Sequence, residues 1–408
     1  MSKVLLIYFI MKKFGGKANK KGKHTIAEHS PKAKKLGALF ARLAASIIII
    51  LAVVLAPTLY VTSNNLVNQK YGQKLAEYQG VVELWNIDSF EGGTNSKTSF
   101  LQARCQEYQK VNKGFYVLVR NMSEAECLLA LADGQRPAMF SFGVGVGSEL
   151  LQYLSAITPN KNNHIRQEFI TSASHQGTTY ALPWCRGVYS LISTKQNLTS
   201  QGLQDKDLGE IALTSGYTKT LRGGKTKTVY SLSFGGGGYT TPQAAFANNY
   251  GVLTQTATSY SSEYSNKTNY DAYCDFVEGK ANILLGTQRD LARMENRISQ
   301  GKAEDVIYKH ITNYTDLVQY IAVCNATSGK LHSQCLNFAD FLTSTGVQQK
   351  LNTIGMFAVC NLASPVYTTG EWAKVEKMCS AACSVQNLFY TKDQIVASRS
   401  QYMQIVST

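Results

Sequence analysis

The sequence predicts an α/β protein of two lobes that follows a basic tail and a hydrophobic anchor. Three observations support this prediction. The 408 residues suffice for two lobes of roughly 150 residues each. Hydrophobic residues make up 44% of the chain and charged residues only 17%, as in a folded protein. From Val81 onward, short apolar strands alternate with helical patterns, which is typical of a parallel sheet covered by helices.

The positive charge of the chain is concentrated at its amino end. The formal net charge is +14, and residues 1–35 contain ten lysines and one acid, Glu28, so that they carry +9. The remaining residues carry +5, which is ordinary for their number. The charge therefore does not indicate nucleic-acid binding by the folded part. We interpret residues 1–35 as a cytoplasmic tail.

A hydrophobic segment follows at residues 36–61 and has no charged residue from Leu43 to Val61. It is long enough to cross about 30 Å of hydrocarbon, and the preceding lysines place the amino end inside. A buried core helix is rarely so apolar all round, and a cleaved signal peptide has a shorter apolar run. We expect a single-pass anchor in the cell membrane, an extracellular carboxyl-terminal domain, and a polar, partly helical stalk at residues 62–80.

The stretch Val81–Gly93, VVELWNIDSFEGG, contains the first candidate binding residues. Its branched apolar residues predict a buried strand that ends in a glycine loop. In open α/β sheets, ligands bind just outside the carboxyl ends of strands. An aromatic ring beside carboxylates suits a ligand that is part apolar and part hydroxylated. The alternative is a core tryptophan followed by a solvated acidic turn. The candidate residues are Trp85, Asp88, Phe90 and Glu91.

Alternating patterns continue beyond this stretch. Ser123 with Glu126 three residues later forms a capping-box signature for a helix. Ala138–Phe142 predicts a strand that enters a GVGVG turn at Gly143. This turn does not match the dinucleotide fingerprint, because Ser148 stands where the last glycine is required. We expect a close-packed turn at the edge of a cleft, with Gly143 beside the ligand.

Further candidate residues lie in the second half of the pattern. Tyr180–Ile192 predicts two apolar strands with an interruption at Pro183 and Gly187, which is typical of a crossing between lobes. A glycine loop at Ser233–Tyr239 suits a turn or a lid beside a ligand. The candidate residues of these segments are Trp184, Arg186, Tyr189 and Tyr239.

Nine cysteines extend from Cys105 to Cys383 without a C-x-x-C pair or a cluster with histidine at metal spacing. Their spacing does not settle their pairing, and most of them are interpreted as small buried apolar residues. We expect no cofactor and no metal. The sequence also lacks the G-x-S-x-G and H-E-x-x-H signatures of hydrolases. Asp88 and Glu91 could imitate the two carboxylates of a glycosidase, so a glycan-active enzyme is a weaker alternative.

Three stretches carry a family resemblance. The first is Asp133-Gly134 with Pro137, and the second is Phe276-x-x-Gly279-Lys280-Ala281 before a strand. The third is Phe338-Ala339-x-Phe341-Leu342-Thr343-Ser344, followed by Val347-Gln348 and Gly355. Together they resemble the extracellular solute-binding proteins of ABC importers, of the maltose-binding-protein type, and in particular carbohydrate-binding members from Gram-positive bacteria. Ala138 departs from the family's usual aspartate after the proline.

The resemblance implies a two-lobed periplasmic-binding-protein-like type II fold. Lobe 1 is expected at 81–182 plus about 290–320, and lobe 2 at 183–289 plus about 321–408. A small ligand, first of all a sugar, would lie in the cleft between the lobes and contact the candidate residues, to which the resemblance adds Gln288 and Arg289 after the strand Asn282–Leu285. The implied partners are ABC permease subunits, and the protein would be a monomer without enzymatic activity. A membrane-tethered ligand sensor without transport is the main alternative.

Overall fold

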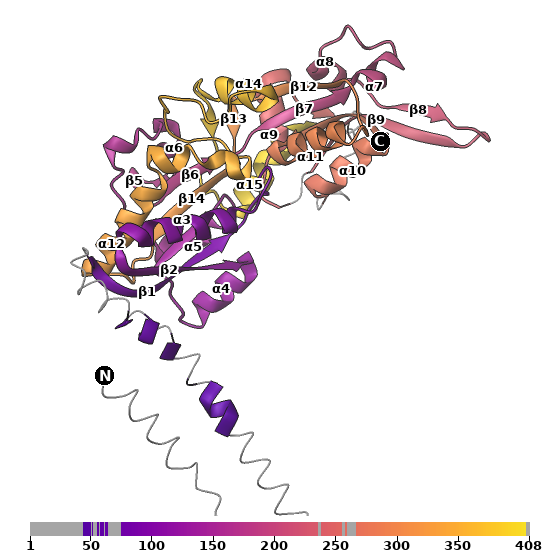
Figure 1. The fold of residues 1–408 in the computed structure, drawn as a ribbon. Coiled ribbons are helices and arrows are strands. Elements are labelled where there is room, and N and C mark those ends of the chain that lie inside the picture. The colour runs from indigo at the N-terminus through magenta and orange to yellow at the C-terminus, as the bar shows by residue number, and fades with distance from the viewer. Residues whose placement is uncertain are drawn as a thin grey trace, which may run out of the picture. The chain divides into compact units, whose positions relative to one another are not determined.

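The computed structural model describes residues 44–49, 51, 55–56, 58–60, 62–63, 75–235, 238–254, 258 and 267–404. The chain divides into two compact units, Met1–Leu59 and Tyr60–Thr408. Two five-stranded sheets lie in the second unit (Figure 1). The hydrophobic clusters around them belong to the same unit. Because this unit contains its own core, it has what a domain needs to fold alone.

The expected tail at 1–35 and most of the expected anchor at 36–61 lie outside the described residues. In the part of the chain that the structure describes, no helix has the length and apolar character needed to cross a membrane. The end of the expected stalk is corrected, because strand β1 begins at Leu75. Glu77 and Gln79 face solvent while Ala76 packs inward. Because only one face of this part of the strand is buried, its sequence is polar enough to be mistaken for a stalk.

The first sheet has the strand order β2-β1-β3-β14-β6. β1 pairs in parallel with β2 and β3, whereas β14 is antiparallel to both β3 and β6. The alternation along β1 puts Leu84 into one hydrophobic cluster and Trp85 into another, so both faces of the sheet are covered. The strands are β1 Leu75–Ile87, β2 Lys113–Met122, β3 Met139–Phe142, β14 Val318–Val323 and β6 Leu182–Arg186.

Helices α3 (Lys97–Val111) and α12 (Gly329–Leu342) contribute to the Leu84 cluster. Helices α4 (Glu124–Ala132) and α6 (Gln167–Ser172) contribute to the Trp85 cluster. The predicted capping box of α4 is confirmed, because Ser123 and Glu126 each bond to the other's backbone amide.

The second sheet has the strand order β12-β7-β11-β9-β8. β9 and β11 are parallel, and the other pairs are antiparallel. Residues of α8 and α9 join the cluster on one face of this sheet, and residues of α10 and α11 join the cluster on the other. The elements are β7 Tyr189–Thr194, β8 Tyr217–Thr220, β9 Thr226–Phe234, β11 Ala281–Thr287, β12 Val306–Ile311, α8 Leu208–Ala212, α9 Pro242–Tyr250, α10 Asn269–Val277 and α11 Gln288–Ser299.

Shorter elements complete the unit. They are α5 Gly147–Leu150, α7 Lys195–Thr199, α13 Thr345–Gln348, α14 Gly370–Cys379, α15 Lys392–Gln401, the strand pairs β4 Ser174–His175 with β5 Thr178–Thr179, β10 Leu253–Thr254 with β16 Met403–Gln404, and β13 Tyr314–Thr315 with β15 Ser384–Val385, and the 3-10 turns η1 Leu151–Tyr153, η2 Lys161–Asn163 and η4 Leu351–Ile354.

The expected lobe boundaries are wrong for two strands. β12 lies within 290–320 but pairs with β7 of the second sheet, and β14 starts before 321 but pairs with β3 and β6 of the first. A strand pattern predicts where a strand is, but its hydrogen-bonding partner follows from tertiary packing. The chain therefore crosses between the sheets at 187–188 and again at 312–317.

These two crossing segments run beside each other. The Gly187 amide donates to the Leu317 carbonyl at 2.6 Å, and the Thr315 hydroxyl donates to the Gly187 carbonyl at 3.2 Å. Arg186 and Phe357 also exchange a pair of backbone hydrogen bonds at 3.0 Å. We call these paired crossings the hinge between the sheets. All nine cysteines are free thiols, and all but Cys274 are buried.

Candidate ligand site between the two sheets

The carboxyl edges of the two sheets meet at this site. In the first sheet the parallel strands β1 and β3 are followed by loops at 88–94 and 143–147. In the second sheet the parallel strands β9 and β11 are followed by Gly235 with residues 238–241 and by the start of α11. Parallel neighbours end at the same edge of a sheet. Contacts between these four segments define the candidate site.

The first-sheet side is built around a buried lysine that the sequence analysis did not single out. Lys97 is 1% exposed, and its ammonium lies 3.5 Å from a carboxylate oxygen of Asp88. It also donates to Oε1 of Gln319 at 3.0 Å and lies 3.6 Å from the centre of the Phe90 ring. Burial lowers the pKa of Lys97, and the negative charge of Asp88 opposes this effect. Ser96 caps the helix that starts at Lys97. A serine before a helical pattern is the sequence signal that could have located this helix start, and with it Lys97.

Amide side chains hold this group in place. Nδ2 of Asn86 donates to Oδ1 of Asn121 at 2.9 Å and to Oδ1 of Asp88 at 3.1 Å. Nε2 of Gln319 donates to the Ile87 carbonyl at 3.0 Å. The end of β1 is therefore fixed by hydrogen bonds to its neighbour β2 and to β14, which lies two strands away. The exposed carboxylate of Asp88 is held in one position beside a cation.

The second-sheet side contacts the same loop through α11. Nε2 of Gln288 donates to the Glu91 carbonyl at 2.7 Å. Nη1 of Arg289 donates to the Gly93 and Thr94 carbonyls at 3.1 and 3.2 Å. Arg293, which was not predicted, forms an ion pair with the Glu91 carboxylate at 3.0 Å. The structure thus brings the predicted residues Glu91, Gln288 and Arg289 together from opposite sheets.

Two glycines allow the loops of the site to pack most closely on neighbouring side chains. An ideal Cβ on Gly143 would lie 1.9 Å from the Ser89 hydroxyl oxygen, so this predicted site residue packs directly on the β1 loop. Gly145 has φ of +94°, and a Cβ there would lie 2.0 Å from the Tyr239 ring. The predicted residue Tyr239 is half-buried and comes from the second-sheet side. Its ring therefore packs on the glycine turn of the first sheet.

Both candidate tryptophans are core residues, which corrects their expected place in the cleft. Trp85 is 1% exposed, meets Phe140 edge-on, and donates its indole N–H to Glu83 at 2.7 Å. Trp184 is fully buried and stacks on Phe100 with ring centres 5.6 Å apart. Helices cover both faces of the first sheet, so neither indole has a face open to a ligand. The alternative of a core tryptophan holds for Trp85.

Arg186 and Tyr189 are also buried, and both belong to the hinge rather than to the loops of the site. Nη2 of Arg186 donates to the Thr312 carbonyl at 3.2 Å. The Tyr189 hydroxyl donates to the Asp316 carboxylate at 2.7 Å. Asp316 is fully buried between β13 and β14, and it also accepts hydrogen bonds from the amide and the hydroxyl of Thr241. Burial raises the pKa of Asp316, and its hydrogen bonds only partly oppose the rise.

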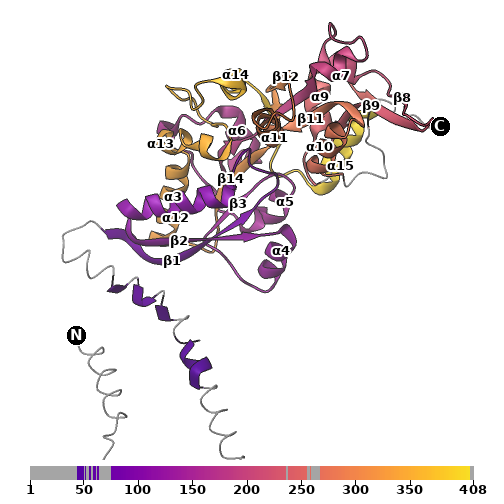
Figure 2. The ribbon, with the colours of Figure 1, turned by 45° about the vertical axis from the view of Figure 1, so that its right-hand side comes forward.

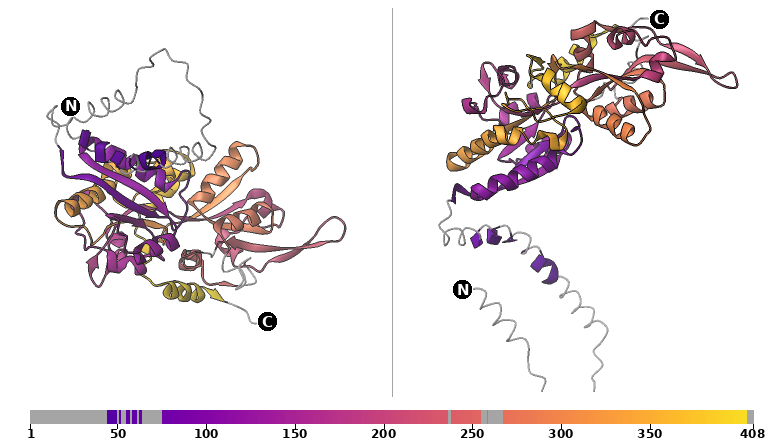
Figure 3. Two further views of the ribbon diagram at one scale, coloured as in Figure 1. Left: turned by 90° about the horizontal axis from the view of Figure 1, so that it is seen from below. Right: turned by 45° about the horizontal axis from the view of Figure 1, so that its top comes forward.

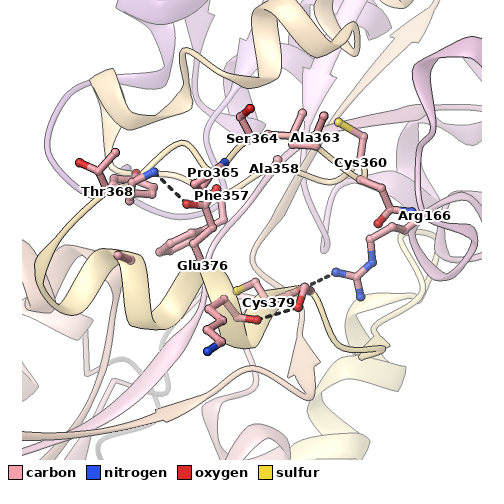
Figure 4. A pocket seen from close by; sticks show the side chains of 16 residues that line it. Arg166, Phe357, Ala358, Cys360, Ala363, Ser364, Pro365, Thr368, Glu376 and Cys379 are labelled. Atoms are coloured by element: carbon pink, nitrogen blue, oxygen red, sulfur yellow. Dashed lines mark hydrogen bonds between the residues drawn. The ribbon is translucent and has the colours of Figure 1, made fainter.

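A hollow of about 830 Å³ is lined by residues of α7 and α11, and two others also lie away from the meeting edges. One, of about 620 Å³, lies between residues 357–368 and α14 (Figure 4). Two of its three charged side chains are already used, because Arg166 donates to the Cys379 carbonyl and Glu376 accepts from the amides of Val366 and Tyr367. The other, of about 800 Å³, lies beside the hinge and is lined by Tyr314 and Gln386. None of the predicted binding residues lines either hollow.

The side chains at the meeting edges offer groups that can contact a ligand. Carboxylates of Asp88 and Glu91 can accept hydrogen bonds from hydroxyl groups, and the ring of Tyr239 can pack against an apolar face. Among the described residues, no group of three His, Cys, Asp or Glu side chains is placed to hold a metal ion.

No protein-family model and no curated protein matches this chain. Solved structures do. The GacH receptor of Streptomyces glaucescens GLA.O, solved unliganded and with acarbose, is similar with a TM-score of 0.55, 14% identity, and coverage of 79% of this chain and 93% of that chain. The maltose/maltodextrin-binding domain MalE of Bdellovibrio bacteriovorus, bound to maltotriose, is similar with a TM-score of 0.53, 14% identity, and coverage of 79% and 93%.

The sugar-binding protein MalE of Xanthomonas citri is a third example, with a TM-score of 0.54, 13% identity, and coverage of 79% of this chain and 90% of that chain. At these identities the similarity concerns the fold. The expected α/β fold of the two-lobed periplasmic-binding-protein type is therefore confirmed for the folded unit. The functions named for these three proteins are not assigned to this chain by the similarity, because a shared fold does not imply a shared function.

Proposed function

We propose that this chain is the extracellular solute-binding component of an ABC transporter and captures a small carbohydrate between its two sheets. One observation carries the proposal. Loops from the carboxyl edges of both sheets meet at Asp88–Thr94, and this is the place where α/β sheets bind ligands. The similar structures include sugar-binding proteins, which supports the ligand class.

The ligand would contact polar groups from both sides of the junction. Asp88 and Glu91 would accept hydrogen bonds from sugar hydroxyls, and Tyr239 would supply the aromatic face. Tyr239 takes this role in our proposal because its side chain is only half-buried, unlike those of Trp85 and Trp184. Gly143 and Gly145 let the turn pack against Ser89 and the Tyr239 ring, which would hold that ring at the edge of the ligand site.

Movement about the hinge would admit and release the ligand. The Glu91–Arg293 ion pair and the hydrogen bonds of Arg289 join the two sides, while the crossings at 187–188 and 312–317 remain paired. Opening would break the ion pair and the hydrogen bonds of Arg289, while the backbone of the two paired crossings would bend. Such hinge closure around a ligand is a common mode of solute capture.

The proposal includes a place for the protein. Residues 36–61 would anchor it as a single transmembrane helix, with the basic tail in the cytoplasm and the folded unit outside, as in a Gram-positive cell. The folded unit would act as a monomer, deliver its ligand to ABC permease subunits and carry out no reaction of its own.

A thermal-shift experiment on the Tyr60–Thr408 unit tests the proposal with maltose, maltotriose, acarbose and xylotriose as probes. A ligand that binds the folded state raises the melting temperature in a concentration-dependent way. We expect at least one saccharide to raise the melting temperature. Tyr239→Ala should lower the apparent affinity for that saccharide at least tenfold. Glu376→Gln, in the hollow of Figure 4, is the matched control and should leave the shift unchanged. Absence of any shift, or an equal loss in both variants, would overturn the proposal.

A further inference from the structure

The β8–β9 hairpin extends beyond the second sheet in Figures 1 and 2 and in both views of Figure 3. Every residue from Tyr217 to Thr226 is exposed. β8 is the last strand of its sheet and pairs with β9 alone. Farther along, β9 enters the core, where Leu232 and Phe234 are fully buried. The hairpin is therefore an exposed extension of a firmly packed strand.

The hairpin contains a concentration of positive charge. From residue 75 to the end, the chain has 28 Lys and Arg residues and 26 Asp and Glu residues, so it is close to neutral. Residues 215–233 contain four of the cations and no acid. Lys227 donates to the Glu278 carbonyl at 2.7 Å. The side chains of Lys219, Arg222 and Lys225 form no ion pair with any described residue.

The end of the hairpin is an ordered turn with an apolar residue. The Leu221 amide donates to the Lys225 carbonyl at 2.7 Å, and the Gly224 amide donates to the Leu221 carbonyl at 3.1 Å. Gly223 and Gly224 have φ of +91° and +77°, and a Cβ on either would have no atom within 4 Å. Leu221 itself is 42% exposed, next to Arg222. An apolar side chain thus lies at the end of the hairpin with cations on both sides.

A protective role for an edge strand explains only part of this arrangement. Lysine on an edge strand hinders pairing with other chains, which accounts for Lys219. Arg222 and Lys225 lie outside the strands, in the turn, where no strand edge needs protection. A soluble polyanion would use the cations but would gain nothing from an exposed leucine. A lipid surface uses both, because cations attract anionic headgroups and the leucine enters the apolar boundary below them.

We propose that the β8–β9 hairpin is a docking element for a membrane surface that contains anionic phospholipids. Lys219, Arg222 and Lys225 contact the headgroups, and Leu221 inserts beneath them. Each cation near an anionic surface strengthens binding roughly fivefold at low salt, so three together contribute roughly 100-fold. The attraction weakens as salt shortens its range. This docking is independent of the ligand site, which lies at the opposite ends of the β9 and β11 strands from the turn.

Vesicle co-sedimentation of the Tyr60–Thr408 unit tests this proposal, since the unit lacks residues 1–59 and their lysines. The probes are vesicles of phosphatidylcholine alone and vesicles that contain phosphatidylglycerol. We expect binding only to the second kind, a loss of roughly 100-fold in the Lys219→Gln/Arg222→Gln/Lys225→Gln variant, and a smaller loss in Leu221→Ser. The matched control replaces exposed lysines elsewhere: Lys110→Gln/Lys161→Gln/Lys330→Gln.

Three results would overturn the docking proposal. The first is no binding to phosphatidylglycerol vesicles, and the second is an equal loss in the hairpin and control variants. The third is unchanged binding in Leu221→Ser together with displacement by soluble polyphosphate, which would identify a polyanion as the partner. Saccharide binding by the same variants stays as in the wild type under every outcome, so failure here is distinct from failure of the proposed ligand site.

Discussion

Tyr189 donates its phenolic hydrogen to the carboxylate of Asp316, with 2.7 Å between the two oxygens, and both side chains are buried in the hinge. The carboxylate has no cationic partner among the described residues. Its hydrogen bonds come from Tyr189 and from the amide and hydroxyl of Thr241. Tyr189 starts β7 and Thr241 precedes α9, so one acid joins the crossing segment to two elements of the second-sheet side.

This buried acid should make stability depend on pH. Burial raises the pKa of Asp316 above the value of about 3.9 in an unfolded chain. The folded state therefore keeps a proton that the unfolded chain has lost, and the free energy of unfolding falls as pH rises from about 4 through the raised pKa. We expect Asp316→Asn to remove this fall in urea denaturation measured between about pH 4 and pH 8.

Asp271 provides the control of opposite sign. Its hydrogen bonds with Thr268 lower its pKa, so its contribution to stability is present above its unfolded pKa and is lost as pH falls. Asp271→Asn should therefore leave the fall at rising pH intact. Parallel pH profiles for the wild type and Asp316→Asn would contradict the account of Asp316.

Lys97 and Asp88 should behave as a coupled pair. Asp88→Asn removes the negative charge beside the buried ammonium and leaves it only neutral oxygen acceptors, and we expect a loss of about 1–2 kcal/mol, less than for a fully buried pair because Asp88 is partly exposed. Adding Lys97→Met to Asp88→Asn should recover part of this loss, because the unpaired charge is gone. A double-mutant cycle by urea denaturation measures the coupling. Additive losses would show that the two side chains do not interact.

Trp85 should matter for stability and not for ligand contact. Trp85→Ala removes a buried indole from the core, for a loss of about 3–5 kcal/mol. Trp85→Phe keeps most of the apolar volume and should remain folded. We expect its saccharide affinity to stay within about twofold of the wild type, since a factor of two is below 0.5 kcal/mol. A large loss of affinity in Trp85→Phe with unchanged melting temperature would restore Trp85 to the ligand site.

Gly145 should be the most sensitive glycine of the turn. Gly145→Ala places a methyl group into the Tyr239 ring at a positive φ, and we expect a loss of about 2–4 kcal/mol. Gly177 has φ of +78° and open space around it, so Gly177→Ala reports the backbone cost alone, about 1 kcal/mol. In a Tyr239→Ala background the cost of Gly145→Ala should fall to that of Gly177→Ala. An unchanged cost would mean that the ring does not press on the turn.

Local patterns in the sequence predicted local structure well. The apolar run at Val81 predicted a strand, and the Ser123 capping box predicted a helix start. Gln288 and Arg289 follow a strand, as expected, and they contact the loop after β1. Sequence alone did not predict which sheet contains β12 and which contains β14, because their pairing partners are set by tertiary contacts.

The buried polar residues were the hardest to predict. Lys97 and Asp316 look like surface charges in the sequence, and their burial depends on partners more than 70 residues away, such as Gln319 and Thr241. For the same reason Trp85 could not be distinguished from a ligand-stacking ring, since its neighbour Phe140 comes from another strand.

Hydrogen exchange of the Tyr60–Thr408 unit with and without a bound saccharide, maltotriose first, tests the central claim most directly. If the ligand lies between the meeting edges, amides of 88–95 and 143–147 from the first-sheet side and of 288–293 from the second should become protected together. Protection on one side only, or confined to the 357–380 hollow, would contradict capture between the two sheets.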